Sequence, residues 1–149
     1  MNDRKEITHD LSDLVTALQD GIEFYDHAIE KRPNSPHNDT YRHFRQVKTS
    51  IIEDLKTQIA MRGEQPPSDG SWLSGIREGY ADVRAMFAKD SDDSYLVNLE
   101  EQEDRVLDAF RDALEDSDSP TVRALAAKYL PDVKRMHDQM RALKRARAA

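Results

Sequence analysis

The chain has 149 residues, 38% hydrophobic and 34% charged, with a formal net charge of −7. This length suits one domain with a buried core, so we expect residues 1–149 to form a single domain. The absence of cysteine excludes disulfides and thiolate metal sites and fits a reducing compartment. The N-terminal segment lacks the apolar run of a signal peptide, and no stretch reaches the length of a membrane span. We therefore expect a cytoplasmic protein without membrane contact.

Apolar residues recur every three to four positions, as on the buried face of a helix. This spacing predicts five helices, at about 8–30, 40–62, 71–88, 93–116 and 120–146. The first is expected to stop at Pro33 and Pro36, and the second at Gly63. No strand-like alternation occurs, so the chain is predicted to be all-α.

Polar residues at the expected helix starts are candidate caps. Asn38 or Asp39 is expected to cap the second helix, and the run from residue 90 to residue 93 to cap the fourth. Pro131 falls inside the last helical pattern, where we expect a kink or a short break near Lys128.

The lengths of the connections predict a topology. The first two helices and the last two are joined by short loops, so each pair should form an antiparallel hairpin. Residues 64–91 form a longer crossover, and its expected helix at 71–88 spans about 26 Å at 1.5 Å per residue. Such a crossover can return the chain to the other end of the bundle. The predicted fold is therefore a ferritin-like four-helix bundle with an extra helix in the crossover.

Four short stretches carry a family resemblance. They are LQDGIEFY at residues 18–25, GEQPP at 63–67, EEQED at 100–104 and HDQMRAL at 137–143. Together they resemble a bacterial family of ferritin-like four-helix-bundle proteins that carries a domain of unknown function. The resemblance implies the fold and implies no established activity.

Two charged residues occupy positions where the helical pattern calls for apolar ones. Glu103 lies in the apolar seam of the fourth helix, and Lys48 lies in that of the second. A buried charge without a partner is strongly unfavourable, and both residues lie at a similar height in the bundle. We therefore predict a Lys48–Glu103 ion pair in the interior, in one layer with Ile22 and Val133.

The same layer is where ferritin-like di-iron proteins bind metal, with a Glu on two helices and a Glu-x-x-His on the other two. Here Lys134 stands three residues before His137, so Glu-x-x-His is missing. We expect Glu100 and His137 to complete the buried polar layer through a hydrogen bond, with no metal and no cofactor. The alternative is a reduced metal site formed by Glu100, Glu103 and His137.

Charge is unevenly distributed along the chain. Residues 90–118 contain twelve acids and two arginines, a net charge of −10, whereas residues 134–149 contain six bases and one acid, a net charge of +5. The basic segment is typical either of an RNA or membrane contact or of a helix C-terminus beside acidic neighbours. No aromatic residues interleave with the bases, so we favour the second interpretation and expect no nucleic-acid partner.

These observations predict a non-enzymatic structural or protein-interaction module. Its partner is not identified by the sequence, and a homodimer is the expected assembly. The alternative is a metal-binding or oxidoreductase-type protein that uses the reduced site. Aromatic residues of the crossover helix, at positions 72, 80 and 87, are expected to cover the bundle or form a dimer surface. Surface positions are expected for His9, His27, His37 and His43.

Overall fold

The computed structural model describes residues 3–67 and 91–148. These residues form four helices, α1 (Asp3–Lys31), α2 (Asn38–Met61), α4 (Asp92–Asp116) and α5 (Pro120–Ala148). Neither described stretch contains a strand, so the all-α prediction is confirmed for this part of the chain. The helix expected at 71–88, with its aromatic residues, lies outside the described residues.

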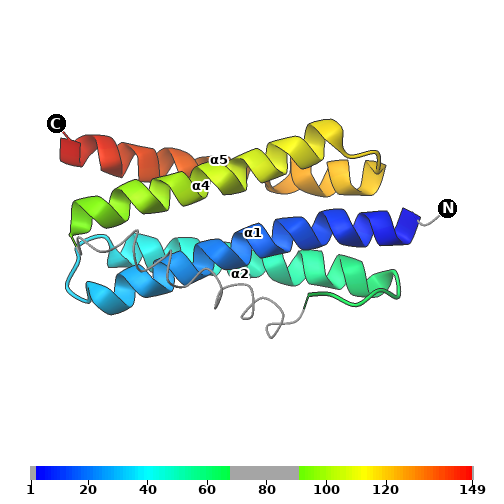
Figure 1. Cartoon of the computed structure of the whole chain (residues 1–149), viewed down its shortest axis with the longest axis horizontal. Helices are drawn as coiled ribbons and strands as arrows, with labels where there is room; N and C mark the ends of the chain where they lie inside the picture. Colours follow the sequence, from blue (N-terminus) through cyan, green and yellow to red (C-terminus); the bar gives the residue numbers. More distant parts are fainter. Residues whose placement is uncertain (1–2, 68–90, 149) are drawn as a thin grey trace.

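The four helices form a bundle of two antiparallel hairpins. α1 pairs with α2 and α4 pairs with α5, and α1 also packs along α4. In Figure 1, α4 runs in the same direction as α2, and the two chain termini lie at opposite ends of the bundle. Each helix therefore buries a face against at least one neighbour from the other hairpin.

The core consists of apolar side chains drawn from all four helices. Their periodic spacing along the chain produces one buried stripe per helix. The stripes are represented by Leu11, Leu14, Leu18, Phe44, Ile51, Leu55, Leu96, Leu99, Phe110, Val122, Val133 and Met140. Among the described residues, no helix is both long and apolar enough to cross a membrane.

Most helix ends follow the local sequence signals. The Ser91 hydroxyl accepts a hydrogen bond from the backbone N–H of Ser94 at 3.1 Å, capping α4. Gly63 has φ +76°, the left-handed conformation that ends a helix and that glycine adopts without strain. The cap expected for α2 is wrong. Asn38 is already helical, and its side-chain amide donates instead to the carbonyl of Arg32, the residue that follows α1, at 2.8 Å.

The last helix is longer and more continuous than predicted. α5 runs through Pro131 without a break, although proline cannot donate to the carbonyl four residues earlier. The expected short break near Lys128 is therefore wrong, and the alternative, a kink, stays a prediction. Buried contacts on both sides of the proline, at Ala126 and Val133, hold the helix against the bundle. α1 also begins at Asp3 rather than at residue 8.

Candidate functional site

The centre of the bundle contains a buried ion pair. Lys48 on α2 places Nζ 2.6 Å from Oε1 of Glu103 on α4, and both side chains have no exposed surface. An ammonium and a carboxylate at this distance form a charge-assisted hydrogen bond. The structure thus brings together the two charged residues that interrupt the apolar seams.

Tyr25 on α1 completes this group. Its hydroxyl donates to Glu103 Oε2 at 2.5 Å, so each carboxylate oxygen has a donor. Burial, and then the neighbouring Glu103 charge and hydrogen bond, raise the pKa of Tyr25 well above its ordinary value. The phenol therefore stays neutral and acts as a donor. Its ring lies against those of Tyr41 and Phe44, with centroids 5.5 and 6.0 Å away.

Gly21 provides the space for the lysine side chain. A Cβ atom at this position would lie 3.1 Å from Cε, 3.2 Å from Nζ and 3.3 Å from Cδ of Lys48, closer than carbon atoms normally approach. Sequence reasoning missed this residue and placed its neighbour Ile22 in the layer. The available signal was the glycine itself, because glycine in the middle of a helix is unfavourable without a packing reason.

A second polar cluster lies on the flank between α4 and α5. His137 Nε2 is 2.5 Å from Asp104 Oδ1 and 3.9 Å from Glu100 Oε1. The other ring nitrogen, Nδ1, is 3.1 Å from Asp138 Oδ1. His137 and Glu100 are buried, whereas the Asp104 side chain is 52% exposed. The closest partner of His137 is therefore Asp104 rather than the expected Glu100.

Glu103 does not belong to this flank cluster. Among the described residues, the group able to converge on one ion consists of Glu100, Asp104 and His137, with Asp104 in place of Glu103. The carboxylate of Glu103 is turned to Lys48 and Tyr25. The expected polar layer is thus divided into a central group and a flank group.

His27 is not a surface residue. It is 8% exposed, and its ring centroid lies 6.1 Å from that of Tyr95. Because α1 packs against both α2 and α4, its buried face is wider than a single stripe and includes this position. His9 and His43 are exposed as expected.

Several cations of the basic segment have acidic neighbours in the structure. Lys144 Nζ lies 3.5 Å from Glu100 Oε2, and Arg147 Nε lies 2.6 Å from Asp93 Oδ1. These contacts fit a helix C-terminus that complements the acidic α4. Arg141 and Arg145 are also exposed.

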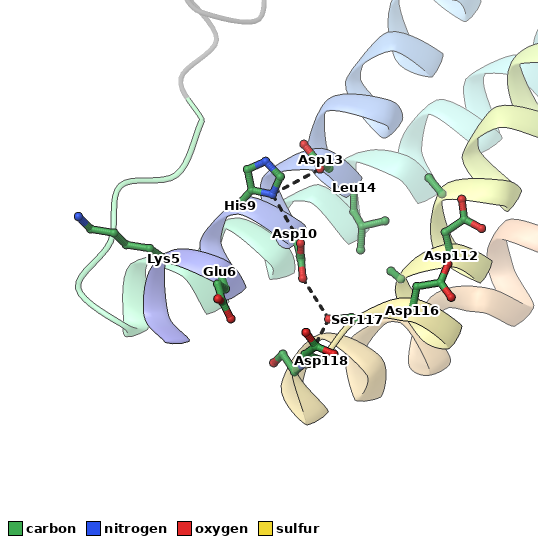
Figure 2. A pocket seen from close by; sticks show the side chains of 13 residues that line it. Lys5, Glu6, His9, Asp10, Asp13, Leu14, Asp112, Asp116, Ser117 and Asp118 are labelled. Atoms are coloured by element: carbon green, nitrogen blue, oxygen red, sulfur yellow. Dashed lines mark hydrogen bonds and ion pairs between the residues drawn. The ribbon is translucent and has the colours of Figure 1, made fainter. Parts of the chain in front are cut away.

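An acidic cleft of about 720 Å³ opens at the end of the bundle where the α4–α5 turn lies beside the first turns of α1. Figure 2 shows acidic side chains entering it from α1, from α4 and from the turn. The six acids are Glu6, Asp10, Asp13, Asp112, Asp116 and Asp118, and two basic residues, Lys5 and His9, also line it.

Comparison with known proteins identifies one family. Residues 6–116 match the family described as a domain of unknown function, DUF2383, and the chain therefore belongs to it. The match covers α1 from residue 6 onward, all of α2 and α4, and the whole central group, and it ends before α5. No curated protein and no solved structure matches the chain.

Proposed function

We propose that this member of the DUF2383 family is a ferritin-like bundle acting in the cytoplasm as a non-enzymatic interaction module. Two antiparallel hairpins, with α4 parallel to α2 (Figure 1), are the arrangement of bundles with one long crossover, such as ferritin. This arrangement supports the ferritin-like architecture alone. The lack of catalytic function rests on the chemistry of the central group.

The buried ammonium of Lys48 is the observation that carries the proposal. Di-iron bundles place several carboxylates at their centre because the charge of the cations must be balanced. Here Glu103 contributes the carboxylate, and its oxygens already accept from Lys48 and Tyr25. A fixed positive charge 2.6 Å from the carboxylate opposes the approach of a metal cation. The centre is therefore suited to structure rather than to metal-dependent oxidation.

The test is the aerobic oxidation of Fe²⁺, followed by the absorbance of the ferric product with and without protein. We expect the full chain to leave the rate unchanged. If the protein accelerates oxidation and Glu103→Gln abolishes the acceleration, the centre is catalytic and the proposal is wrong. The exposed neighbour Glu101 provides the matched control, Glu101→Gln, and circular dichroism checks that both variants fold.

We further propose that the module binds a second copy of itself through the acidic cleft. Two exposed cations, Arg141 and Arg145, lie one turn apart on α5 and so share a face of that helix. They lie toward the C-terminus, at the end of the bundle opposite the cleft (Figure 1). In an antiparallel two-fold dimer, the basic end of each copy can meet the acidic cleft of the other, and both contacts form at once.

Charge reversal tests this dimer. One variant carries Arg141→Glu with Arg145→Glu. The other carries Asp13→Lys, Asp112→Lys and Asp116→Lys, so that the cleft then holds four lysines against three acids and becomes net positive. We expect sedimentation velocity to show a dimer for the parent chain at low salt that weakens at high salt. Each variant alone should be monomeric. An equimolar mixture should restore a mixed dimer, because both of its contacts then join opposite charges. A parent chain that stays monomeric at every salt concentration contradicts the proposal, as does a mixture that stays monomeric.

A further inference from the structure

The flank cluster contains more carboxylate than a neutral histidine can satisfy. Both ring nitrogens of His137 face acids, with Nε2 beside Asp104 and Nδ1 beside Asp138. A neutral imidazole carries one N–H and can donate to one side alone. The other nitrogen then directs a lone pair at a carboxylate, unless a proton or a metal cation lies between them. The arrangement therefore needs a cation.

The positions of the ligand atoms fit a single metal ion. His137 Nε2 and one oxygen each of Glu100 and Asp104 all lie within 4.8 Å of one another. Ligands at about 2.0–2.2 Å from a shared ion lie about 3–3.5 Å apart. Side-chain rotations would therefore move Asp104 Oδ1 away from Nε2, from 2.5 Å, and bring Glu100 Oε1 nearer, from 3.9 Å. Glu100 and Asp104 are one turn apart on α4 and share a face, while His137 comes from α5. No movement of the helices is required.

The surroundings support a metal site as well. Asp138 lies beside Nδ1 at 3.1 Å, and a carboxylate that accepts from the outer nitrogen leaves Nε2 free to bind a metal. Glu100 and His137 are more than nine-tenths buried, which restricts their orientations, while the exposed Asp104 leaves room for water ligands. Within the described part of the chain, Lys144 is paired with the set, with its Nζ 3.5 Å from Glu100 Oε2, whereas Oε1 of Glu100 faces the histidine.

We infer that Glu100, Asp104 and His137 bind one divalent transition-metal ion, with Zn²⁺ as the best match. One imidazole nitrogen and two carboxylate oxygens suit zinc and its neighbours in the first row, whereas Ca²⁺ and Mg²⁺ prefer oxygen ligands alone. The site takes two ligands from α4 and one from α5, so the bound ion would cross-link these two helices. It is separate from the proposed interaction function and does not use Glu103.

Isothermal titration calorimetry of the untagged full chain with ZnCl₂ tests the site. We expect one ion per chain, with binding at least tenfold weaker in Asp104→Asn and in His137→Gln. Asp108→Asn is the matched control, because Asp108 is exposed on α4 one turn beyond Asp104. Its affinity should equal that of the parent. MgCl₂ and CaCl₂ should give no comparable binding.

A thermal melt provides a second readout. Zinc should raise the unfolding midpoint temperature of the parent chain and of Asp108→Asn, and should leave the midpoint temperature of Asp104→Asn unchanged. Absence of zinc binding overturns the inference. Zinc binding that survives in His137→Gln and is lost in His9→Gln also overturns it, since His9 lies beside Asp10 and Asp13 in the acidic cleft.

Discussion

Replacing Lys48 with methionine probes the buried pair most sharply. Methionine keeps an unbranched side chain of similar length and removes the ammonium, so the helix seam stays filled. Glu103 is then left without its cationic partner at a position with no exposed surface. The expected result is a large loss of stability without a change of fold.

The magnitude follows from the contacts of the carboxylate. Removing one partner of a buried ion pair costs about 3–5 kcal/mol. Glu103 keeps its second donor, the Tyr25 hydroxyl at 2.5 Å, and a hydrogen bond to a charged group contributes about 1.5–3 kcal/mol. We therefore expect Lys48→Met to lower the free energy of unfolding by about 3 kcal/mol, the lower end of this range. At a urea slope of about 2 kcal/mol per molar, the midpoint should fall by about 1.5 M.

Urea unfolding followed by circular dichroism measures this change. Lys31→Met, at an exposed position at the end of α1, is the matched control and should leave the midpoint within about 0.5 kcal/mol of the parent.

Removal of the partner charge should recover the stability. Lys48→Met combined with Glu103→Leu leaves no buried ion, although the Tyr25 hydroxyl then lacks its acceptor. Adding Tyr25→Phe removes this last unpaired group, and the triple variant should equal or exceed the parent. A harmless Lys48→Met, within about 0.5 kcal/mol of the control, would refute the reasoning, since the carboxylate could not then depend on the ammonium.

Three further changes test the same geometry. Gly21→Ala should lower the free energy of unfolding despite the helix propensity of alanine, because the new Cβ would contact the Lys48 side chain. Thermal melts measure this change. A variant that is more stable than the parent by about 1 kcal/mol would contradict the prediction. In an alkaline titration at 295 nm, Tyr25→Phe should remove absorbance change from the latest phase, because the raised pKa of Tyr25 keeps it neutral until the fold opens. In the unfolded chain the Tyr25 phenol ionises near its ordinary pKa. The free energy of unfolding of the parent chain should therefore fall as the pH rises above about 10, by up to about 1.4 kcal/mol per pH unit from this group. If Tyr25→Phe instead removes absorbance change from the earliest phase of the titration, Tyr25 is accessible to solvent and the prediction is wrong. Gly63→Ala should cost about 1–2 kcal/mol in urea unfolding, because φ +76° is strained for alanine, and an unchanged midpoint would place the α2 end in another conformation.

The central group was accessible to sequence reasoning because charge stands out against an apolar stripe. Lys48 and Glu103 each interrupt a regular seam, and the hairpin lengths place them at one height. The four helices that the structure describes follow from the same periodicity, apart from a few terminal residues. Gly21 was missed because a residue without a side chain adds nothing to a periodic pattern.

The flank group shows where periodicity stops being informative. Asp104 follows Glu103 by one residue, about 100° further around the helix, so the pattern assigns it to solvent. The Asp104 side chain is indeed 52% exposed, and its carboxylate still lies 2.5 Å from His137 Nε2. That contact depends on how far α4 is rotated against α5, which no single-helix pattern determines. His27 was misplaced for a related reason, because α1 has two neighbouring helices.

Anomalous diffraction from crystals soaked in Fe²⁺ under anaerobic conditions tests the central ion pair most directly. With Lys48 and Glu103 joined at 2.6 Å, no iron peak should appear beside the Glu103 carboxylate or the Tyr25 hydroxyl. An ordered iron atom bound to Glu103, with Lys48 displaced, would contradict the claim that the Lys48–Glu103 ion pair is structural and excludes metal.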